Sequence, residues 1–157
     1  MDAKVVWDQE MHFTGSSHTG FEVPLDSGPS TGGTDSGFRP LELLAIGLAG
    51  CTAMDVLSIV RKKRQDVTAF EVQVRADQQD DYPHVFTRAT IVYQLTGHAV
   101  DEAAVLRAIE LSALHYCPAQ AMLAKAFPME LIYELYEDRG GDVRELVRQG
   151  QWLPPEN

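Results

Sequence analysis

The sequence contains little cysteine, few basic residues and no long uncharged stretch, and each shortage narrows the possible functions. Its 157 residues include two cysteines, fewer than a disulfide-stabilised secreted scaffold needs. Thirteen Lys and Arg residues stand against 23 Asp and Glu residues, and the formal net charge is −10. Because phosphate binding needs a basic surface, we expect no nucleic-acid partner and no binding to an anionic membrane. The N-terminus lacks the basic and long apolar segments of a signal peptide, so we expect a cytoplasmic location, where permanent disulfides are rare.

The hydrophobic content of 45% is sufficient for a core, and residues 40–64 form a strongly apolar segment. Pro40 suits the first position of a helix, Glu42 suits the positive end of the helix dipole, and the basic residues 61–64 suit the negative end. Between these ends apolar residues occupy every face, a pattern typical of a buried helix. The uncharged run spans only residues 43–54, shorter than the roughly 20 residues that a bilayer requires, so we predict a core helix rather than a membrane span.

The two cysteines fall at positions where a helix controls their environment. Cys51 lies inside the predicted central helix, with Asp55 one turn later, and we expect Asp55 to bind a basic residue or a backbone donor. Cys117 precedes Pro118, which predicts that a second helix begins here, where the helix dipole and free N–H groups favour a thiolate. A buried cysteine is most often a small hydrophobic residue, so two unreactive thiols remain the alternative.

The remaining pattern predicts strands and helices in alternating groups. Pro24 favours an edge position for the third strand, and the Gly- and Ser-rich residues 27–38 predict a long loop that leads into the central helix. We also expect residues 142–150 to form a short surface helix. The expected strands are residues 3–8, 11–14, 21–26, 67–77, 85–95 and 129–136, and the expected further helices are residues 101–116 and 118–127.

This order of elements predicts an α+β fold with an antiparallel sheet. The central helix is too apolar for one sheet to cover, so we expect a second copy of the chain to cover its remaining face in a homodimer. Apolar residues on both faces of the strand expected at 129–136 also fit a central strand or an interface.

Two motifs form a specific combination: Phe38-Arg-Pro-Leu-Glu-Leu-Leu-Ala-Ile-Gly-Leu-Ala-Gly-Cys-Thr-Ala-Met-Asp-Val56 and, far downstream, Tyr116-Cys117-Pro118. Together and in this order they resemble the OsmC/Ohr family, the osmotically inducible and organic hydroperoxide resistance proteins. The resemblance covers residues 1–137 as one OsmC-like domain and leaves residues 138–157 as a C-terminal extension. It implies an antiparallel sheet wrapped around a long buried central helix in an intertwined homodimer, with active sites at the dimer interface.

The chemistry that the resemblance implies is thiol-dependent reduction of hydroperoxides in defence against oxidative stress. Cys51 would attack the distal oxygen of the hydroperoxide and become a sulfenic acid, Cys117 would condense with it to a disulfide, and an external thiol would reduce the pair. Apolar surroundings favour organic hydroperoxides over hydrogen peroxide. Because burial disfavours a thiolate, the attacking cysteine needs a nearby cation, for which Arg39 is the candidate and His115 the reserve.

Two positions depart from the family pattern. Family hydroperoxidases carry a catalytic glutamate directly after the helix-starting proline, where this chain has Leu41; its glutamate is Glu42, and a shift of one residue rotates a helical side chain by about 100°. Those enzymes also use an arginine in the N-terminal hairpin turn, where residues 15–20 contain none, and Arg39 could substitute for it. The candidate catalytic residues are therefore Cys51, Cys117, Arg39 and Glu42.

Two other functions remain open. The first is a non-catalytic dimer that keeps the fold and binds a small apolar ligand at its interface, which the two departures favour. The second is a zinc site built from His115, Cys117 and Cys51, although no close Cys/His spacing supports it. For the peroxidase and for the binding protein we predict no metal and no cofactor.

Overall fold

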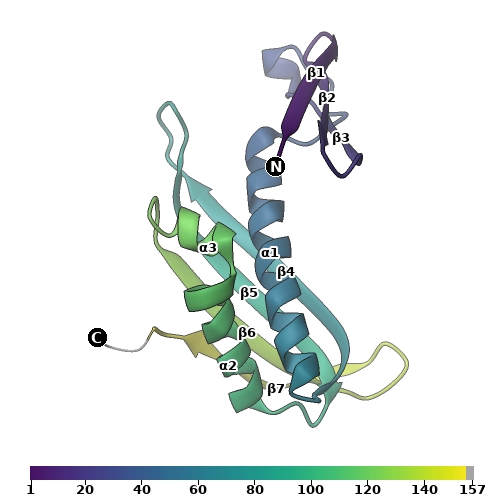
Figure 1. Ribbon diagram of the computed structural model, residues 1–157, viewed down its shortest axis with the longest axis vertical. Helices are drawn as coiled ribbons and strands as arrows, with labels where there is room; N and C mark the ends of the chain where they lie inside the picture. Colours follow the sequence, from purple (N-terminus) through teal and green to yellow (C-terminus); the bar gives the residue numbers. More distant parts are fainter. Residues whose placement is uncertain (155–157) are drawn as a thin grey trace. The chain divides into compact units, whose positions relative to one another are not determined.

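The computed structural model describes residues 1–154 and divides into two compact units, Met1–Leu44 and residues 45 onward. The long helix α1 (Pro40–Lys62) begins in the first unit and continues into the second (Figure 1). Its proline start and its basic last turn agree with the prediction from the sequence.

The first unit contains a three-stranded antiparallel sheet in the order β1-β2-β3. The predicted strands are confirmed, and Pro24 lies in the edge strand β3, as expected. Strand β2 continues through residues 15–17, which we expected to turn, because Gly15 pairs with both Val5 and Val23. The elements are β1 (Ala3–Gln9), β2 (His12–Ser17), β3 (Glu22–Leu25) and a short 3₁₀ helix, η1 (Pro29–Thr31).

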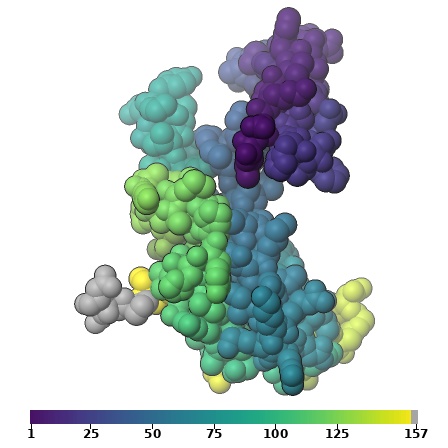
Figure 2. Space-filling model, viewed as in Figure 1, coloured from purple at the N-terminus to yellow at the C-terminus, as the bar shows by residue number. Residues whose placement is uncertain are grey.

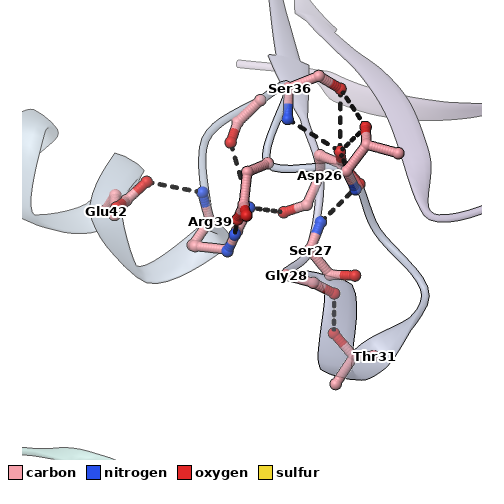
Figure 3. Close-up of polar contacts among 10 residues, drawn as sticks. Asp26, Ser27, Gly28, Thr31, Ser36, Arg39 and Glu42 are labelled. Atoms are coloured by element: carbon pink, nitrogen blue, oxygen red, sulfur yellow. Dashed lines mark hydrogen bonds and ion pairs between the residues drawn. The ribbon is translucent and has the colours of Figure 1, made fainter.

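The loop before α1 is ordered around the buried carboxylate of Asp26 (Figure 3). This carboxylate accepts hydrogen bonds from the backbone N–H groups of Ser27, Thr34 and Ser36 at 2.7, 2.9 and 3.0 Å. The hydroxyls of Thr34 and Ser36 donate to it as well, each at 2.9 Å. Backbone hydrogen bonds from Ser36 and Thr34 hold the pKa of Asp26 well below its usual range. The loop that composition predicted therefore has a fixed internal structure.

The second unit contains a four-stranded sheet in the order β4-β5-β6-β7. Its neighbouring strands are antiparallel except for β5 and β6, which pair in parallel. The chain passes from β5 to β6 through helices, and such a crossover connection makes two strands parallel. The elements are β4 (Asp66–Gln78), β5 (Phe86–His98), α2 (Glu102–Leu111), a π-helical turn η2 (Ser112–Tyr116), α3 (Pro118–Leu123), β6 (Met129–Asp138) and β7 (Arg144–Trp152).

Helices cover one face of this sheet, and the core of the second unit lies between the two layers (Figure 1). In the space-filling view the green atoms of the segment from α2 to α3 lie directly against the blue atoms of α1 (Figure 2). Val56 and Val60 of α1 are fully buried in one cluster with Ile91 and Leu95 of β5 and with Ile109 of α2. Each such side chain stabilises the fold by about 1.5–3 kcal/mol through removal from water.

The C-terminal segment forms a strand instead of the surface helix that we expected over residues 142–150. Strand β7 pairs antiparallel with β6 and places Leu146 opposite Tyr136. The Arg144 guanidinium lies 4.1 Å from the centre of the Tyr136 ring, a cation–π contact. The helix prediction was wrong because β6 offers an open edge of N–H and C=O groups, and pairing with that edge outweighs local propensity.

Helix α1 buries one stripe of side chains within the single chain and leaves another exposed. The buried residues are Leu48, Thr52, Val56 and Val60. Ile46 is 50% exposed and Met54 is 77% exposed. With 23 residues, α1 is long and apolar enough to cross a membrane, whereas its uncharged run alone had indicated too short a segment. The core helix of a soluble protein can have the same length and composition. Because its buried stripe belongs to the core of the second unit, we interpret α1 as a core helix.

Candidate active site

The two cysteines of the chain lie near each other in the second unit. Cys51 is half-buried midway along α1, and Cys117 is 2% exposed at the start of α3. Both are free thiols, and the Cys51 sulfur is close enough to influence the titration of Cys117. The fold thus brings together two thiols that the sequence places far apart.

Cys117 is the N-cap residue of α3, as its position before a proline predicted. Pro118 is the first residue of the helix, and the Cys117 sulfur accepts a hydrogen bond from the Gln120 backbone N–H at 3.4 Å. The backbone N–H of Cys117 donates in turn to the Ser112 carbonyl at 2.9 Å, where η2 ends. These contacts give the sulfur a defined position.

Burial decides the protonation state of Cys117. Removal from solvent raises the pKa of the Cys117 thiol to about 12, with a contribution from the Cys51 sulfur and against the hydrogen bond from the Gln120 N–H. We expected the helix start to favour a thiolate here, but α3 has only six residues and desolvation outweighs its effect. Cys117 is therefore a neutral thiol near pH 7, and the more exposed Cys51 is the better candidate for an attacking thiolate.

Five hydrogen-bonded side chains link the elements that carry the cysteines. We call them the polar chain: Thr52 and Asp55 of α1, Tyr93 of β5, Ser112 of η2 and Gln120 of α3. The Thr52 hydroxyl lies 2.7 Å from that of Tyr93 and 3.0 Å from that of Ser112. Ser112 donates to the Asp55 carboxylate at 3.1 Å, and the Gln120 side-chain amide donates to the Tyr93 hydroxyl at 3.1 Å. Burial raises the pKa of Tyr93 to about 12, so its phenol keeps its proton.

The sequence did not reveal the polar chain, and the expected partners of Asp55 were wrong. This carboxylate accepts from the Ser112 hydroxyl rather than from a basic residue or a backbone donor. The available signals were Thr52 within the uncharged run of the central helix and Ser112 in an amphipathic segment. Thr52 finds its partners 41 and 60 positions away in the sequence, a distance that helical periodicity cannot bridge.

Arg39 and Glu42 meet at the start of α1, in the first unit (Figure 3). The Glu42 carboxylate accepts from the Arg39 backbone N–H at 2.8 Å, the return half of a capping box. The Arg39 guanidinium donates to the Asp26 carbonyl at 2.9 Å and pairs with the Asp35 carboxylate. Both side chains therefore have partners within the loop and the helix start, whereas the two cysteines belong to the second unit.

The chain also matches known proteins over most of its length. Its residues 33–132 match the OsmC-like protein family. The chain belongs to the OsmC-like family. Protein YhfA from Escherichia coli K12 is 35% identical to this OsmC-like chain over 135 residues, which are 86% of the chain and 98% of YhfA.

Solved structures of OsmC-like proteins share the fold. The OsmC-like protein of Mycoplasma pneumoniae has a TM-score of 0.72 at 19% identity, over 85% of this chain and 95% of that one. An organic hydroperoxide resistance protein of Elizabethkingia anophelis has a TM-score of 0.62 at 14% identity, over 87% and 94% of the two chains. These similarities confirm the α+β architecture with its long central helix. Strand β7 lies outside the segment that matches the family.

The zinc alternative finds no support in the geometry. The His115 side chain is exposed and lies beside the Tyr116 ring, with the ring centres 6.5 Å apart. Over residues 1–154 no group of three His, Cys, Asp or Glu side chains is arranged to hold a metal ion. The polar groups of the polar chain are three hydroxyls, one amide and the Asp55 carboxylate, and they hydrogen-bond to one another.

Proposed function

We propose that this OsmC-like protein reduces organic hydroperoxides through Cys51 and Cys117. The Cys51 thiolate attacks the distal oxygen of the hydroperoxide, so an S–O bond forms while the O–O bond breaks. The alkoxide that leaves takes up a proton and departs as an alcohol. Cys51 has then lost two electrons and is a sulfenic acid.

Cys117 resolves this sulfenic acid. Its sulfur attacks the Cys51 sulfur, an S–S bond forms, the S–O bond breaks, and the hydroxyl leaves as water with the Cys117 proton. An external thiol reductant then returns two electrons and two protons by thiol–disulfide exchange. The high pKa of Cys117 suits this second role, because a neutral thiol does not compete for the peroxide.

The proximity of the two thiols supports this proposal most directly. They are the only cysteines among 157 residues, and a disulfide requires their Cα atoms to come within roughly 7 Å. A relative with the same fold is an organic hydroperoxide resistance protein, which favours the same class of substrate here. Arg39 remains our candidate for the charge that favours the Cys51 thiolate, with Glu42 as its neighbour at the helix start.

We infer that the active form is a homodimer. Ile46 and Met54 expose apolar surface on α1, and the helix offers open space beside Gly47 and Gly50, where a second helix can approach closely. We also infer a cytoplasmic location, because the disulfide of a catalytic pair must be reduced again in each cycle and a reducing compartment supplies thiols for that step.

Thiol counting after one equivalent of cumene hydroperoxide tests the proposal. The wild-type protein should lose both thiols, consume the peroxide and show an intrachain disulfide by mass spectrometry. Cys117→Ser should consume peroxide and give a Cys51 sulfenic acid that dimedone traps, whereas Cys51→Ser should consume none. If peroxide leaves both thiols free in the folded wild-type protein, the peroxidase proposal is wrong.

One observation favours a second function, a dimer that binds a small apolar ligand without turnover. The Glu42 carboxylate is used at the helix start, where it accepts a hydrogen bond from the Arg39 backbone N–H. Leu41 occupies the position that the family resemblance assigns to the catalytic glutamate. A binding protein would take up an apolar fluorescent probe with saturable stoichiometry per dimer, and organic hydroperoxide would leave both its thiols unchanged.

A further inference from the structure

We propose that the polar chain is the device that positions Cys51 and Cys117 for disulfide formation. This inference rests on the proposed function, because a positioned pair matters only if the two sulfurs react. A disulfide needs a specific geometry, with its Cα atoms within roughly 7 Å and a defined torsion about the S–S bond. Apolar packing alone allows a helix to slide or rotate slightly, whereas hydrogen bonds between buried groups specify one arrangement.

The direction of every hydrogen bond in the polar chain follows from its two ends. As a carboxylate, Asp55 only accepts, so Ser112 donates its one proton to Asp55 and accepts from Thr52. Thr52 must then accept from Tyr93, whose oxygen accepts from the Gln120 amide. Each hydroxyl therefore donates once and accepts once. The carboxylate at one end and the amide at the other leave the hydroxyls a single pattern.

The polar chain is attached to both elements that carry a cysteine. Thr52 follows Cys51 in α1, so the bonds of its hydroxyl set the rotation of α1 about its axis. Gln120 is 4% exposed and donates its side-chain amide to Tyr93 and its backbone N–H to the Cys117 sulfur. A single residue thus connects the polar chain to the resolving sulfur.

The burial of the polar chain makes it specific. Thr52, Tyr93 and Ser112 are each 0% exposed, so a hydroxyl that lost its partner would remain unsatisfied. An unmade buried hydrogen bond is unfavourable, which penalises every other register of α1 against β5, η2 and α3. In the reduced protein, the polar chain therefore favours the arrangement of helices in which the two thiols can form a disulfide.

Equilibration with reduced and oxidised glutathione tests this positioning without peroxide. In the reaction, one glutathione disulfide and the two protein thiols give the protein disulfide and two glutathione thiols. The equilibrium constant measures how well the folded protein holds Cys51 and Cys117 together. A substitution that destabilises reduced and oxidised protein equally leaves this constant unchanged, so a merely structural role would not move it.

Removing one hydroxyl should weaken the pair. We expect Thr52→Val and Tyr93→Phe to lower the equilibrium constant about tenfold, a shift of about 30 mV in the two-electron potential. Thr52→Ser keeps the hydroxyl, and its equilibrium constant should stay within about threefold of the wild-type value. The same is expected of Val60→Ala, which lowers the melting temperature by a change in the core outside the polar chain. With cumene hydroperoxide, Thr52→Val should form the sulfenic acid at the wild-type rate but close the disulfide more slowly, so dimedone traps more of it.

The outcomes separate this inference from the proposed function. If the wild type forms the disulfide with glutathione but ignores peroxide, the peroxidase proposal fails, and the glutathione constants still decide the role of the polar chain. If Thr52→Val and Thr52→Ser have equal constants, or if the wild type forms no disulfide with glutathione, the positioning role is wrong. The comparison of Thr52→Val with Thr52→Ser tests the positioning role even if Tyr93→Phe does not fold.

Discussion

The two thiols differ in their surroundings. Cys117 is buried and neutral near pH 7, while Cys51 is half-buried on the central helix. A hydroperoxide reacts with the thiolate, and the accessible sulfur is the one that it can reach. This difference can be tested with single substitutions in two measurements: the pH dependence of stability and the alkylation rate of Cys51.

Cys117 should make the fold sensitive to alkaline pH. Its pKa is raised to about 12 in the folded protein, whereas an unfolded thiol titrates near pH ~8.5. The stability that the neutral thiol contributes is complete below about pH 8.5 and is lost as the pH rises toward the folded pKa. Urea midpoints under reducing conditions should therefore fall more steeply above about pH 8.5 for the wild type than for Cys117→Ala. Cys51→Ala serves as the control, and parallel pH profiles for wild type and Cys117→Ala would contradict the assignment.

Arg39 should matter for the reactivity of Cys51 if its charge activates the thiol. An opposite charge nearby favours a thiolate, so Arg39→Ala should slow alkylation of Cys51 by iodoacetamide about tenfold near pH 7. Asp35→Ala is the matched control, because it removes the ion-pair partner of Arg39 but keeps the guanidinium. An unchanged alkylation rate in Arg39→Ala, with an intact circular dichroism spectrum, would rule out this role.

Two segments, the loop before α1 and strand β7, are each held in place by a small set of contacts. The loop before α1 depends on one carboxylate that accepts five hydrogen bonds, and β7 depends on close contact with β6. Each element contains one residue whose replacement should loosen it.

Asp26 should make the first unit sensitive to acid. Hydrogen bonds to its charged form hold its pKa below the unfolded value of about 3.9, so its contribution to stability is complete above about pH 4 and is lost as the pH falls. Asp26→Asn should be less stable than the wild type at neutral pH, and the difference should shrink toward about pH 2. Urea unfolding between these pH values measures it, with the exposed Asp80→Asn as control. A constant difference across the acid range would show that Asp26 is not the titrating group.

Gly150 should be required where β7 passes β6. A Cβ at this position would lie 2.6 Å from the Tyr133 hydroxyl, which donates to Glu102 at 2.5 Å. Because Tyr133 is buried, Gly150→Ala should force a side chain to move and cost about 1–3 kcal/mol in the free energy of unfolding. The neighbouring Gln149→Ala is exposed and should cost under about 0.5 kcal/mol. Equal urea midpoints for the two variants would argue against tight packing at Gly150.

The whole molecule is expected to work as a pair of chains. The second unit buries one stripe of α1, and the exposed apolar residues of that helix are available for a second copy. Isologous contact between two such helices would bury the same exposed stripe on both chains.

A charge on the exposed stripe should separate the dimer. Met54→Asp would bury an unpaired carboxylate, so we expect the dimer dissociation constant to rise at least about a hundredfold in sedimentation velocity experiments. Tyr82→Asp, at a similarly exposed apolar residue in the turn between β4 and β5, should leave the constant unchanged. A wild-type protein that sediments as a folded monomer at micromolar concentration would remove the dimer from the proposal.

The sequence by itself determined what neighbouring residues encode. The proline start and basic end of α1, most of the strands, and the cap at Cys117 follow from periodicity and capping within a few positions. The two cysteine motifs were sufficient to indicate the OsmC-like family, which the match over residues 33–132 confirms.

Only the tertiary structure decided what depends on distant segments meeting. Residues far apart in sequence meet in three places: Cys51 lies near Cys117, the polar chain joins four elements, and β7 pairs with β6. The high pKa of Cys117 also belongs here: its position at a helix start favours a thiolate, but burial by the assembled core disfavours charge more strongly. A local pattern states what a residue can do, and the folded surroundings decide which of those properties it shows.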